Sequence, residues 1–306
     1  MGLHVIVGAG PVGSALAREL LDTGHDVRVV TRSGSGIEGT ERVKADAADG
    51  ARLGELAHGA VAIHNCVNPP YHRWAEEWPA ISAALITAAE SSGAVLATTA
   101  NLYGYGPVDA PMTEDTPLAA TGPKGRVRNA MWHDALAAHE AGRIRTFEVR
   151  GSDYLGGNSL LSLVIAPALR KGKRAMVPAD LDAPHTFTDV RTVAKLLAVG
   201  TADERAWGRA WHVPSAEPTT LRRITQLAAD QLGATPKLTA LPYAAVWVAG
   251  LFSPFIKELR ETQHQFRKPF VLDSGRATAT FGLTAPTLED SVRYDLEQNA
   301  PQPTGG

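Results

Sequence analysis

The stretch from Val5 to Ser33, VIVGAGPVGSALARELLDTGHDVRVVTRS, restricts the possible folds more than any other part of the chain. Gly8, Gly10 and Gly13 form the pattern GxGxxG between a β-rich run and a helical pattern. Such glycines permit a tight turn and let backbone N–H groups approach a diphosphate at the helix N-terminus. Pro11 suits the first helical turn, which tolerates a missing N–H. We therefore predict a strand, a dinucleotide-binding turn, a helix and a second strand.

Short β-rich runs alternate with alanine- and leucine-rich helical patterns through the first half of the chain. The expected strands are Leu3–Val7, Asp26–Thr31, Ala60–Asn65, Ala94–Thr99 and Arg145–Arg150. The expected helices are Pro11–Thr23, a short one near Ala51–Leu56, Trp78–Ser91 and about Lys124–Ala141. This alternation is typical of parallel strands joined by crossover helices. We expect an α/β fold with a doubly wound parallel sheet of the Rossmann type and at least five strands.

The pattern changes after Arg150 to loops and shorter segments, with a helix expected from Leu160 to Leu169. A turn into a helix follows in HTFTDVRTVAKLLAVG, then a strand in RAWHVPSAE and a capped helix in TTLRRITQLAADQLG. The apolar run Tyr243–Ile256 is shorter than the roughly 20 residues that a bilayer needs, so we expect one amphipathic helix packed on the body. We divide the chain into a nucleotide-binding domain over 1–155, a mainly substrate-binding region over 156–298 with segments that return to the sheet, and a frayed tail over 299–306.

Charge and composition argue against several classes of protein. The formal net charge is −2 and the 30 Lys and Arg are scattered, so nothing indicates binding to nucleic acid or to a membrane. The single cysteine, Cys66, cannot form an intrachain disulfide, and the N-terminus has no export signal, so we expect a cytoplasmic protein. The ten histidines show no metal-binding spacing, so we expect no metal site.

The residues after the second predicted strand bear on the choice of cofactor. A site for NAD usually has Asp or Glu there, which binds the ribose 2′-hydroxyl. This chain has Thr31, Arg32 and Ser33, and the planar guanidinium of an arginine pairs well with a 2′-phosphate. We therefore predict NADP(H) as the preferred cofactor, with NAD(H) as the alternative. Arg32 could instead be a solvated surface charge, and Asp46 either contacts the adenine amine or caps the next helix.

The middle of the chain, LATTANLYGYGPVDAPMTEDTPLAATGPKGRVRNAMWHDALAAHE, resembles the extended and atypical short-chain dehydrogenase/reductases, the NAD(P)-dependent epimerase/dehydratase group. In that family a Ser/Thr-rich strand end precedes VYG, then P.TE..P, then a catalytic YxxxK at the start of a long helix. This chain has Thr98 and Thr99, then LYG at Leu102–Gly104, then PMTEDTPL at Pro111–Leu118. HTFTDVRTVAKLL and RAWHVPSAEPTTLRRI are similar to later family segments, so the resemblance covers roughly Leu3–Gly282.

Two positions depart from the family pattern. The catalytic tyrosine falls on Lys124 and the lysine on Arg128, so the chain reads KxxxR in place of YxxxK. The extended enzymes usually show GxxGxxG, and Val7 stands at the first of those glycines. Both departures resemble the atypical branch, in which some members are not ordinary oxidoreductases.

The resemblance implies a catalytic set. Thr99 matches the Ser/Thr that polarises a substrate carbonyl, although a strand-end hydroxyl satisfied by backbone is the alternative. Lys124 and Arg128 are four residues apart and share one helix face. Burial and like charge both disfavour an ammonium group, so Lys124 is predicted to act as general acid while Arg128 binds the nicotinamide ribose. Alternatively, both cations face solvent or only anchor the cofactor. Tyr103, in the loop after Thr99, is a further catalytic candidate.

Other residues of the predicted site follow from strand ends and aromatic side chains, with two groups expected. The motif at the glycine turn and the end of the second strand, together with the resemblance, predict these cofactor contacts: Gly8, Gly10, Pro11, Val12, Gly13, Thr31, Arg32, Ser33, Asp46, Asn65, Cys66, Val67, Arg128, Gly151 and Ser152. The expected substrate contacts are Tyr71, Trp74, Tyr105 and Tyr154. Any of these tyrosines could simply pack, and Cys66 reads as a small core residue because no partner base is evident.

The predicted function is an NADP(H)-dependent oxidoreductase that reduces a C=O or C=N bond of a small, apolar or ring-bearing molecule. Two alternatives stay open. One is an epimerase or dehydratase that retains its cofactor, and the other is a non-catalytic protein that senses NADP(H). The resemblance also suggests a homodimer.

Overall fold

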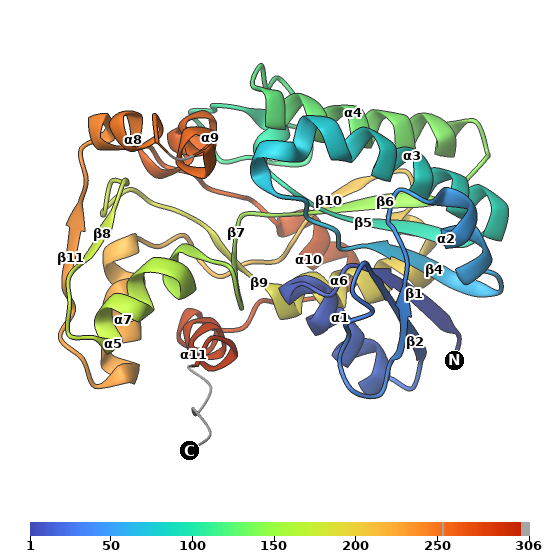
Figure 1. Ribbon diagram of the computed structural model, residues 1–306, viewed down its shortest axis with the longest axis horizontal. Coiled ribbons are helices and arrows are strands. Elements are labelled where there is room, and N and C mark those ends of the chain that lie inside the picture. The colour runs from blue at the N-terminus through green and yellow to red at the C-terminus, as the bar shows by residue number, and fades with distance from the viewer. Residues whose placement is uncertain (253, 301–306) are drawn as a thin grey trace.

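The computed structural model describes residues 1–252 and 254–300. Seven parallel strands form one sheet in the order β10-β6-β5-β4-β1-β2-β3 (Figure 1). The strands are β1 (Leu3–Val7), β2 (Asp26–Thr31), β3 (Glu41–Lys44), β4 (Ala60–Asn65), β5 (Val95–Asn101), β6 (Thr146–Gly151) and β10 (Ala210–His212). The order reverses between β1 and β4, the switch point beside which open α/β sheets bind ligands. The predicted doubly wound fold is confirmed.

Helices cover both faces of this sheet, as Figure 1 shows. One face packs on α1 (Pro11–Asp22) and α6 (Val190–Ala202), and the other packs on α2 (Gly50–Leu56), α3 (Trp74–Ser92) and α4 (Pro123–Glu140). Because side chains alternate along a strand, Ile6 contacts the first layer while its neighbours Val5 and Val7 contact the second. Burial on both faces explains the continuous apolar runs of the strands.

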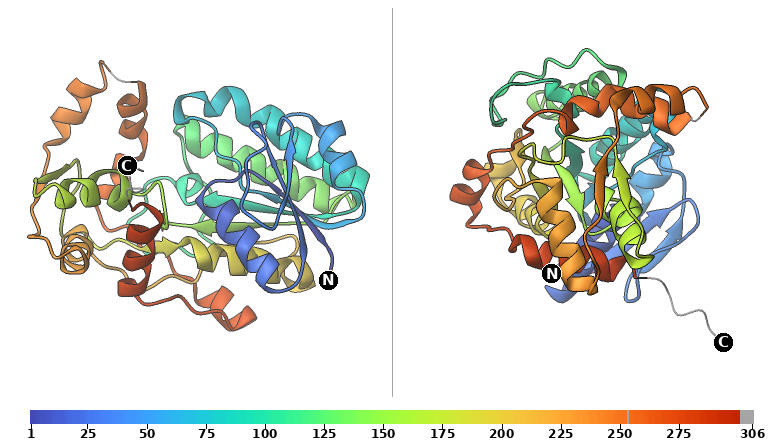
Figure 2. Two further views of the ribbon diagram at one scale, coloured as in Figure 1. Left: turned by 60° about the horizontal axis from the view of Figure 1, so that its bottom comes forward. Right: turned by 90° about the vertical axis from the view of Figure 1, so that its left-hand side faces the viewer.

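A smaller lobe lies beyond the carboxyl ends of the strands (Figures 1 and 2). Its core joins residues of α5, α7, α11 and β8. The short strands β7 and β9 pair in parallel between the lobes. Its elements, with those around it, are β7 (Asp153–Leu155), α5 (Ala166–Arg170), β8 (Ala175–Val177), β9 (Phe187–Asp189), α7 (Leu221–Leu232), β11 (Leu238–Ala240), α8 (Tyr243–Ala249), α9 (Pro254–Thr262), α10 (Gly275–Phe281) and α11 (Leu288–Gln298). Single turns are η1 (Tyr71–Arg73), η2 (Tyr103–Tyr105), η3 (Leu161–Ile165), η4 (Glu204–Ala206) and η5 (Gln263–Phe266).

Three local predictions need correction. The edge strand β3 was not expected, because its sequence ERVK is polar and largely exposed. Helix α3 begins at Trp74 rather than Trp78, since both indoles are buried against the sheet. The run Tyr243–Ile256 is not one helix: α8 ends before Gly250 and α9 starts at Pro254. Neither is it packed throughout, because Leu251 and Phe252 are 73% and 86% exposed.

Most of the expected tail 299–306 lies outside the described residues. Over residues 1–252 and 254–300, none of the helices combines the length and the apolar character that crossing a bilayer requires.

Candidate functional site

The glycine turn joins β1 to α1. Two of its glycines are required by close backbone contacts, and the third has free space beside it. Gly8 has φ +105°, and a Cβ there would lie 2.5 Å from the carbonyl oxygen of Cys66. A Cβ on Gly13 would lie 2.0 Å from the carbonyl oxygen of Gly8. A Cβ on Gly10 would meet nothing within 4 Å. Gly8 and Gly13 therefore allow strand and helix to pack closely, while Gly10 faces free space.

The start of α1 presents unused hydrogen-bond donors to that space. Gly10 is the N-cap residue and provides no side chain to cap the helix, which begins at Pro11. The first amides of a helix have no intrahelical partner, so Val12 and Gly13 keep N–H groups for a ligand. Together with the dipole of the helix, these donors suit a diphosphate. The turn fits the dinucleotide expected from the sequence.

The second strand ends in an exposed, non-acidic loop. Thr31 donates a hydrogen bond from Oγ1 to the carbonyl oxygen of Ser35 at 3.1 Å, and the Ser33 hydroxyl contacts the Ser35 hydroxyl at 2.9 Å. Arg32 is exposed. Asp46 accepts a hydrogen bond from the Ala48 amide at 3.0 Å. Helix α2 is capped by Asp49, so the alternative role of Asp46 as its N-cap is wrong.

The ends of β4 and β5 bring Cys66 beside Thr99, with Sγ 3.7 Å from Oγ1. Burial raises the pKa of the Cys66 thiol to about 12, although the hydrogen bond to Thr99 opposes this. A protonated thiol is a poor nucleophile, so Cys66 is not arranged for attack. Asn65 turns its Oδ1 back to accept the Val67 amide at 3.2 Å.

Arg128 lies inside the site rather than on its surface. Its guanidinium stands 4.6 Å from the ring centre of Trp74 and 4.7 Å from that of Trp78. The residue is 8% exposed, and in the part of the chain that the structure describes its Nε and Nη1 have no hydrogen-bond partner. Burial lowers the pKa of Arg128 while Glu148 opposes the change, and an arginine stays charged nonetheless. A buried cation with two unused donors fits a ligand with hydroxyl or anionic oxygens.

Lys124 is buried at the start of α4, where it is 2% exposed. Its ammonium contacts the carboxylates of Glu258 and Glu261, both on α9. Glu261 also accepts a hydrogen bond from the Lys124 amide at 2.7 Å, so it caps the helix. The predicted neighbour Arg128 does lie one turn away, but the two acidic partners were not expected. They come from positions 134 and 137 residues further along the chain.

Three aromatic residues lie beside Lys124 and Arg128. The hydroxyls of Tyr71 and Tyr103 share a hydrogen bond, and the Trp74 ring lies 5.0 Å from Tyr71 and 5.9 Å from Tyr103. Lys124 Nζ is 5.6 Å from the centre of the Tyr71 ring. Burial raises the pKa of both phenols, so they stay protonated and able to donate. We call these residues, with Arg128, the strand-end cluster: Tyr71, Trp74, Tyr103, Lys124 and Arg128.

Two predicted tyrosines lie differently. Tyr105 is 2% exposed, and its hydroxyl contacts His212 Nε2 at 2.7 Å and Arg150 Nη1 at 2.8 Å, in a buried network apart from the cluster. Tyr154 donates its hydroxyl proton to the carbonyl oxygen of Ala100 on β5. Burial raises its pKa, and the charge of Arg128 opposes the rise.

The segment after β6 closes over the glycine turn. A Cβ on Gly151 would lie 2.3 Å from the Tyr154 ring, and the buried hydroxyl of Ser152 has no partner among the described residues. Gly156 and Gly157 have φ of +122° and +136°. A Cβ on Gly157 would lie 2.9 Å from Cγ of Pro11, so only glycine lets the loop approach the turn this closely.

A pair of residues near the cluster was missed by the sequence reasoning. His185, just before β9, places Nε2 2.5 Å from Oδ2 of Asp153 on β7. Burial is the largest cause of the raised pKa of Tyr71 and Tyr103, and the charge of Asp153 raises both further, whereas the hydrogen bond to Tyr103 lowers the pKa of Tyr71. The only available signals were an Asp in the loop after a strand and a His in the family-like HTF segment. Their pairing is set by the β7–β9 contact.

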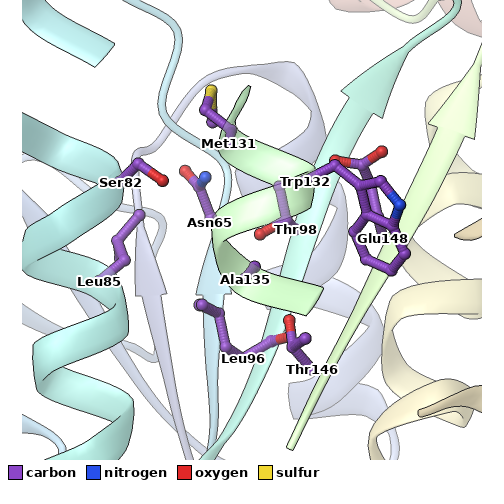
Figure 3. Close-up of a pocket in the computed structure, with 10 residues that line it drawn as sticks. All are labelled: Asn65, Ser82, Leu85, Leu96, Thr98, Met131, Trp132, Ala135, Thr146 and Glu148. Atoms are coloured by element: carbon purple, nitrogen blue, oxygen red, sulfur yellow. The ribbon is translucent and has the colours of Figure 1, made fainter. Parts of the chain in front are cut away.

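Two hollows are lined by residues other than those of the strand-end cluster. An internal cavity of about 10 Å³ lies between α3, α4 and the sheet. Figure 3 labels the side chains that line it, among them the polar residues Asn65, Thr98 and Glu148. A cavity of this size holds one water molecule. A surface groove of about 570 Å³ runs between residues 214–219 and 284–288. Neither contains a residue predicted for catalysis.

Comparison with known proteins gives the same fold. Residues 4–208 match the model of the NAD dependent epimerase/dehydratase family. Three solved structures are similar over nearly the whole of both chains. A UDP-glucose 4-epimerase of Thermus thermophilus in complex with NAD has a TM-score of 0.78 at 16% identity, covering 98% of this chain and 99% of that one. A dTDP-glucose 4,6-dehydratase of Bacillus anthracis str. Ames in complex with NAD has 0.79 at 14%, covering 97% and 96%.

The third, a UDP-glucose 4-epimerase of Brucella ovis in complex with NAD, has a TM-score of 0.80 at 17% identity and covers 98% of each chain. At these identities the likeness establishes the fold alone. No curated protein matches the sequence. The family match extends over more than half of the chain, from β1 through α6 to the loop before β10. The chain therefore belongs to the NAD dependent epimerase/dehydratase family.

Proposed function

We propose that the protein is a nicotinamide-dependent enzyme of the epimerase/dehydratase type that interconverts an alcohol and a carbonyl on a small molecule and retains its cofactor between steps. The observation that carries the proposal is Arg128: a buried cation between two indoles, whose donor nitrogens Nε and Nη1 are both unused among the described residues. Burying such donors costs free energy unless a ligand satisfies them. The nicotinamide ribose, with two hydroxyls, suits them.

Different residues of the chain bind different parts of the cofactor. The amides of Val12 and Gly13 bind the diphosphate, and Arg32 binds the 2′-phosphate, so NADP(H) is preferred and NAD(H) is accepted. Asn65–Val67 at the end of β4 and Gly151–Ser152 at the end of β6 would hold the nicotinamide end. When bound, the nicotinamide exchanges a hydride with a substrate carbon. Retention of the cofactor is supported by the loop after β6, in which Gly157 packs on Pro11 beside the glycine turn.

The substrate lies against the strand-end cluster. Thr99 donates a hydrogen bond to the substrate oxygen, and the rings of Tyr71 and Trp74 form an apolar wall. This wall favours a ring-bearing or apolar molecule over a strongly polar one. Lys124 is surrounded by Glu258 and Glu261, so its ammonium balances two carboxylates and orients α9 over the wall.

A second candidate is a reductase that exchanges its cofactor at each turnover and reduces a C=O or C=N bond. The exposure of Gly10 and Arg32 favours it, because both predicted phosphate contacts are accessible to solvent. The two candidates differ in a simple measurement. A retained cofactor copurifies with the protein and shows no net consumption, whereas an exchanging reductase oxidises added NADPH in proportion to product.

The test uses the purified full chain, its bound nucleotide released by denaturation and separated by chromatography, and turnover with a panel of alcohols, aldehydes, ketones and imines. Arg128→Met should weaken nicotinamide binding by about tenfold or more, since it removes charge-assisted hydrogen bonds worth about 1.5–3 kcal/mol. Arg126→Met is the matched control, because Arg126 is exposed on the same helix. Equal cofactor binding by parent and Arg128→Met, with both folded, would contradict the proposal. A parent that binds the nucleotide but turns over nothing would favour the sensor.

A further inference from the structure

Asp153 and His185 are held together by the backbone of both lobes. Asp153 starts β7, which follows β6 directly, and His185 precedes β9, the parallel partner of β7. The backbone of His185 exchanges two hydrogen bonds with Thr219, at 2.7 and 2.8 Å. Its ring lies parallel to Phe266, with 5.3 Å between ring centres and 7° between planes. The imidazole is therefore fixed in place and orientation.

The hydrogen-bond partners of His185 determine how many protons its pair with Asp153 holds. Nδ1 lies 3.1 Å from the backbone carbonyl oxygen of Gln265, which can only accept, so Nδ1 carries a proton. Nε2 lies 2.5 Å from Oδ2 of Asp153. A bare Nε2 and a carboxylate oxygen would present two lone pairs to each other at this distance. A second proton therefore lies between them, on one atom or the other.

The two ends of the pair differ in access. The side chain of His185 is 4% exposed, while that of Asp153 is 30% exposed. In the described part of the chain, Oδ1 of Asp153 accepts no hydrogen bond, so one carboxylate oxygen is unused. Asp153 is close enough for its charge to act on Tyr71 and Tyr103 of the strand-end cluster. The buried end can thus hold a proton. The more open end belongs to a residue that directly follows Gly151 and Ser152, the predicted cofactor contacts at the end of β6.

We propose that Asp153 is the catalytic acid and base of the site, and that His185 is a positioning residue that supplies and recovers its proton. This inference rests on the proposed function. It gives Asp153 the part that the sequence alone assigned to Lys124, whose ammonium contacts two carboxylates instead.

The proton and electron balance is simple. In reduction, the substrate carbonyl carbon gains the hydride that the nicotinamide supplies, the C=O π bond breaks, and the oxygen takes a proton from the Asp153 carboxyl. The pair is left with a carboxylate and a neutral imidazole, whose one remaining proton can move from Nδ1 to Nε2 and so lie between Nε2 and Oδ2. In oxidation, the carboxylate takes the alcohol proton as the hydride leaves, and the shared proton is restored. One cycle of epimerisation therefore needs no net proton, while net reduction draws one from solvent.

The charge of Asp153 acts on Tyr71 of η1 and Tyr103 of η2, and Arg128 of α4 acts on both phenols while Glu261 of α9 acts on Tyr71. Lys124 of α4 and Glu258 of α9 join this group through the ion pairs of the Lys124 ammonium. The Lys124 ammonium sits between the two glutamates, so these three groups together carry one negative charge, which Arg128 balances. Loss of the shared proton adds one negative charge to this group of side chains.

Asp153→Asn tests the shared proton directly, because the Asn amide can donate a hydrogen bond to Nε2 but does not act as an acid. Histidine labelled with ¹⁵N is measured in the full chain as purified, with its bound nucleotide, and the His185 signal is assigned by its loss in His185→Gln. We expect the Nε2 signal to differ clearly between parent and Asp153→Asn, with a strongly deshielded proton in the parent alone. An Nε2 signal that is the same in both proteins overturns the proposal.

Turnover provides the second readout. Asp153→Asn should lower kcat by about 100-fold or more, the usual effect of a general acid, and leave KM and nicotinamide binding within about threefold. His185→Gln should lower kcat less than Asp153→Asn does, and it should change the pH dependence of kcat. Asp182→Asn, an exposed carboxylate near His185, is the control and should behave as the parent. Full activity in Asp153→Asn, or loss in Lys124→Met alone, overturns the donor role. A parent with no turnover refutes both proposals, whereas unchanged nicotinamide binding with an unaffected kcat refutes only this one.

Discussion

A row of three histidines predicts how stability depends on pH. His4 on β1 places Nδ1 2.9 Å from His64 Nε2, and its Nε2 lies 3.2 Å from His25 Nδ1. Burial lowers the pKa of His4 from 6.5 to about 4, with further lowering by the charge of His25. Burial, and then His4, lowers the pKa of His64 as well. The folded protein therefore resists protonation that the unfolded chain accepts.

The sign and the size follow from this difference. Between pH 6.5 and about 4 the unfolded chain binds a proton at position 4 that the folded protein does not, so the free energy of unfolding falls as the pH falls. At about 1.4 kcal/mol per pH unit, His4 alone accounts for a loss of about 3 kcal/mol across this window. His64 acts in the same direction and steepens the loss.

The assay is urea unfolding of the parent and of His4→Gln at several pH values from about 7.5 to about 4 (the range that brackets the window). The variant keeps a polar side chain that does not titrate, so its stability should fall by about 3 kcal/mol less than that of the parent over the same range. His133→Gln, at an exposed position on α4, is the control and should follow the parent. Parallel stability curves for the parent and His4→Gln would refute the reasoning.

The remaining predictions concern the cofactor. Gly13→Ala should destabilise the fold by about 1–3 kcal/mol in thermal unfolding, because its Cβ would lie 2.0 Å from the Gly8 carbonyl oxygen, whereas Gly10→Ala should keep stability and weaken only dinucleotide binding. The reverse order of stabilities would contradict this assignment. Arg32→Ala should weaken NADPH binding by about tenfold or more and NADH binding little in titration calorimetry, since it removes a charge-assisted contact to the 2′-phosphate. Equal losses for both nucleotides would remove the basis for NADP(H).

Lys124 and Arg128 of the KxxxR pattern have the predicted spacing on the helix, but the charged neighbours of Lys124 in the folded chain differ from those expected. Their spacing correctly places Lys124 and Arg128 one turn apart on α4. The expectation that Lys124 donates a proton assumed a pocket in which Arg128 is its main charged neighbour. Glu258 and Glu261 approach from α9, so the ammonium has two carboxylate partners. Whether Lys124 takes part in proton transfer stays a prediction that the Lys124→Met variant can test.

Sequence alone determined the parts of this protein that depend on neighbours along the chain. The alternation of β-rich and helical runs predicted the sheet, and the glycines after β1 predicted the turn, because period and backbone sterics act over a few residues. The strand β3 was missed since its polar residues ERVK carry no apolar pattern.

Tertiary structure decided what the site contains. Asp153 and His185 are 32 residues apart, and Lys124 meets its carboxylates 134 and 137 residues further along the chain. The orientation of Arg128 between two indoles depends on how α4 packs on α3. These contacts form only when segments that are distant in the sequence pack together and exclude water. A local sequence pattern therefore does not predict which charges are balanced, which donors are buried or which protons are shared.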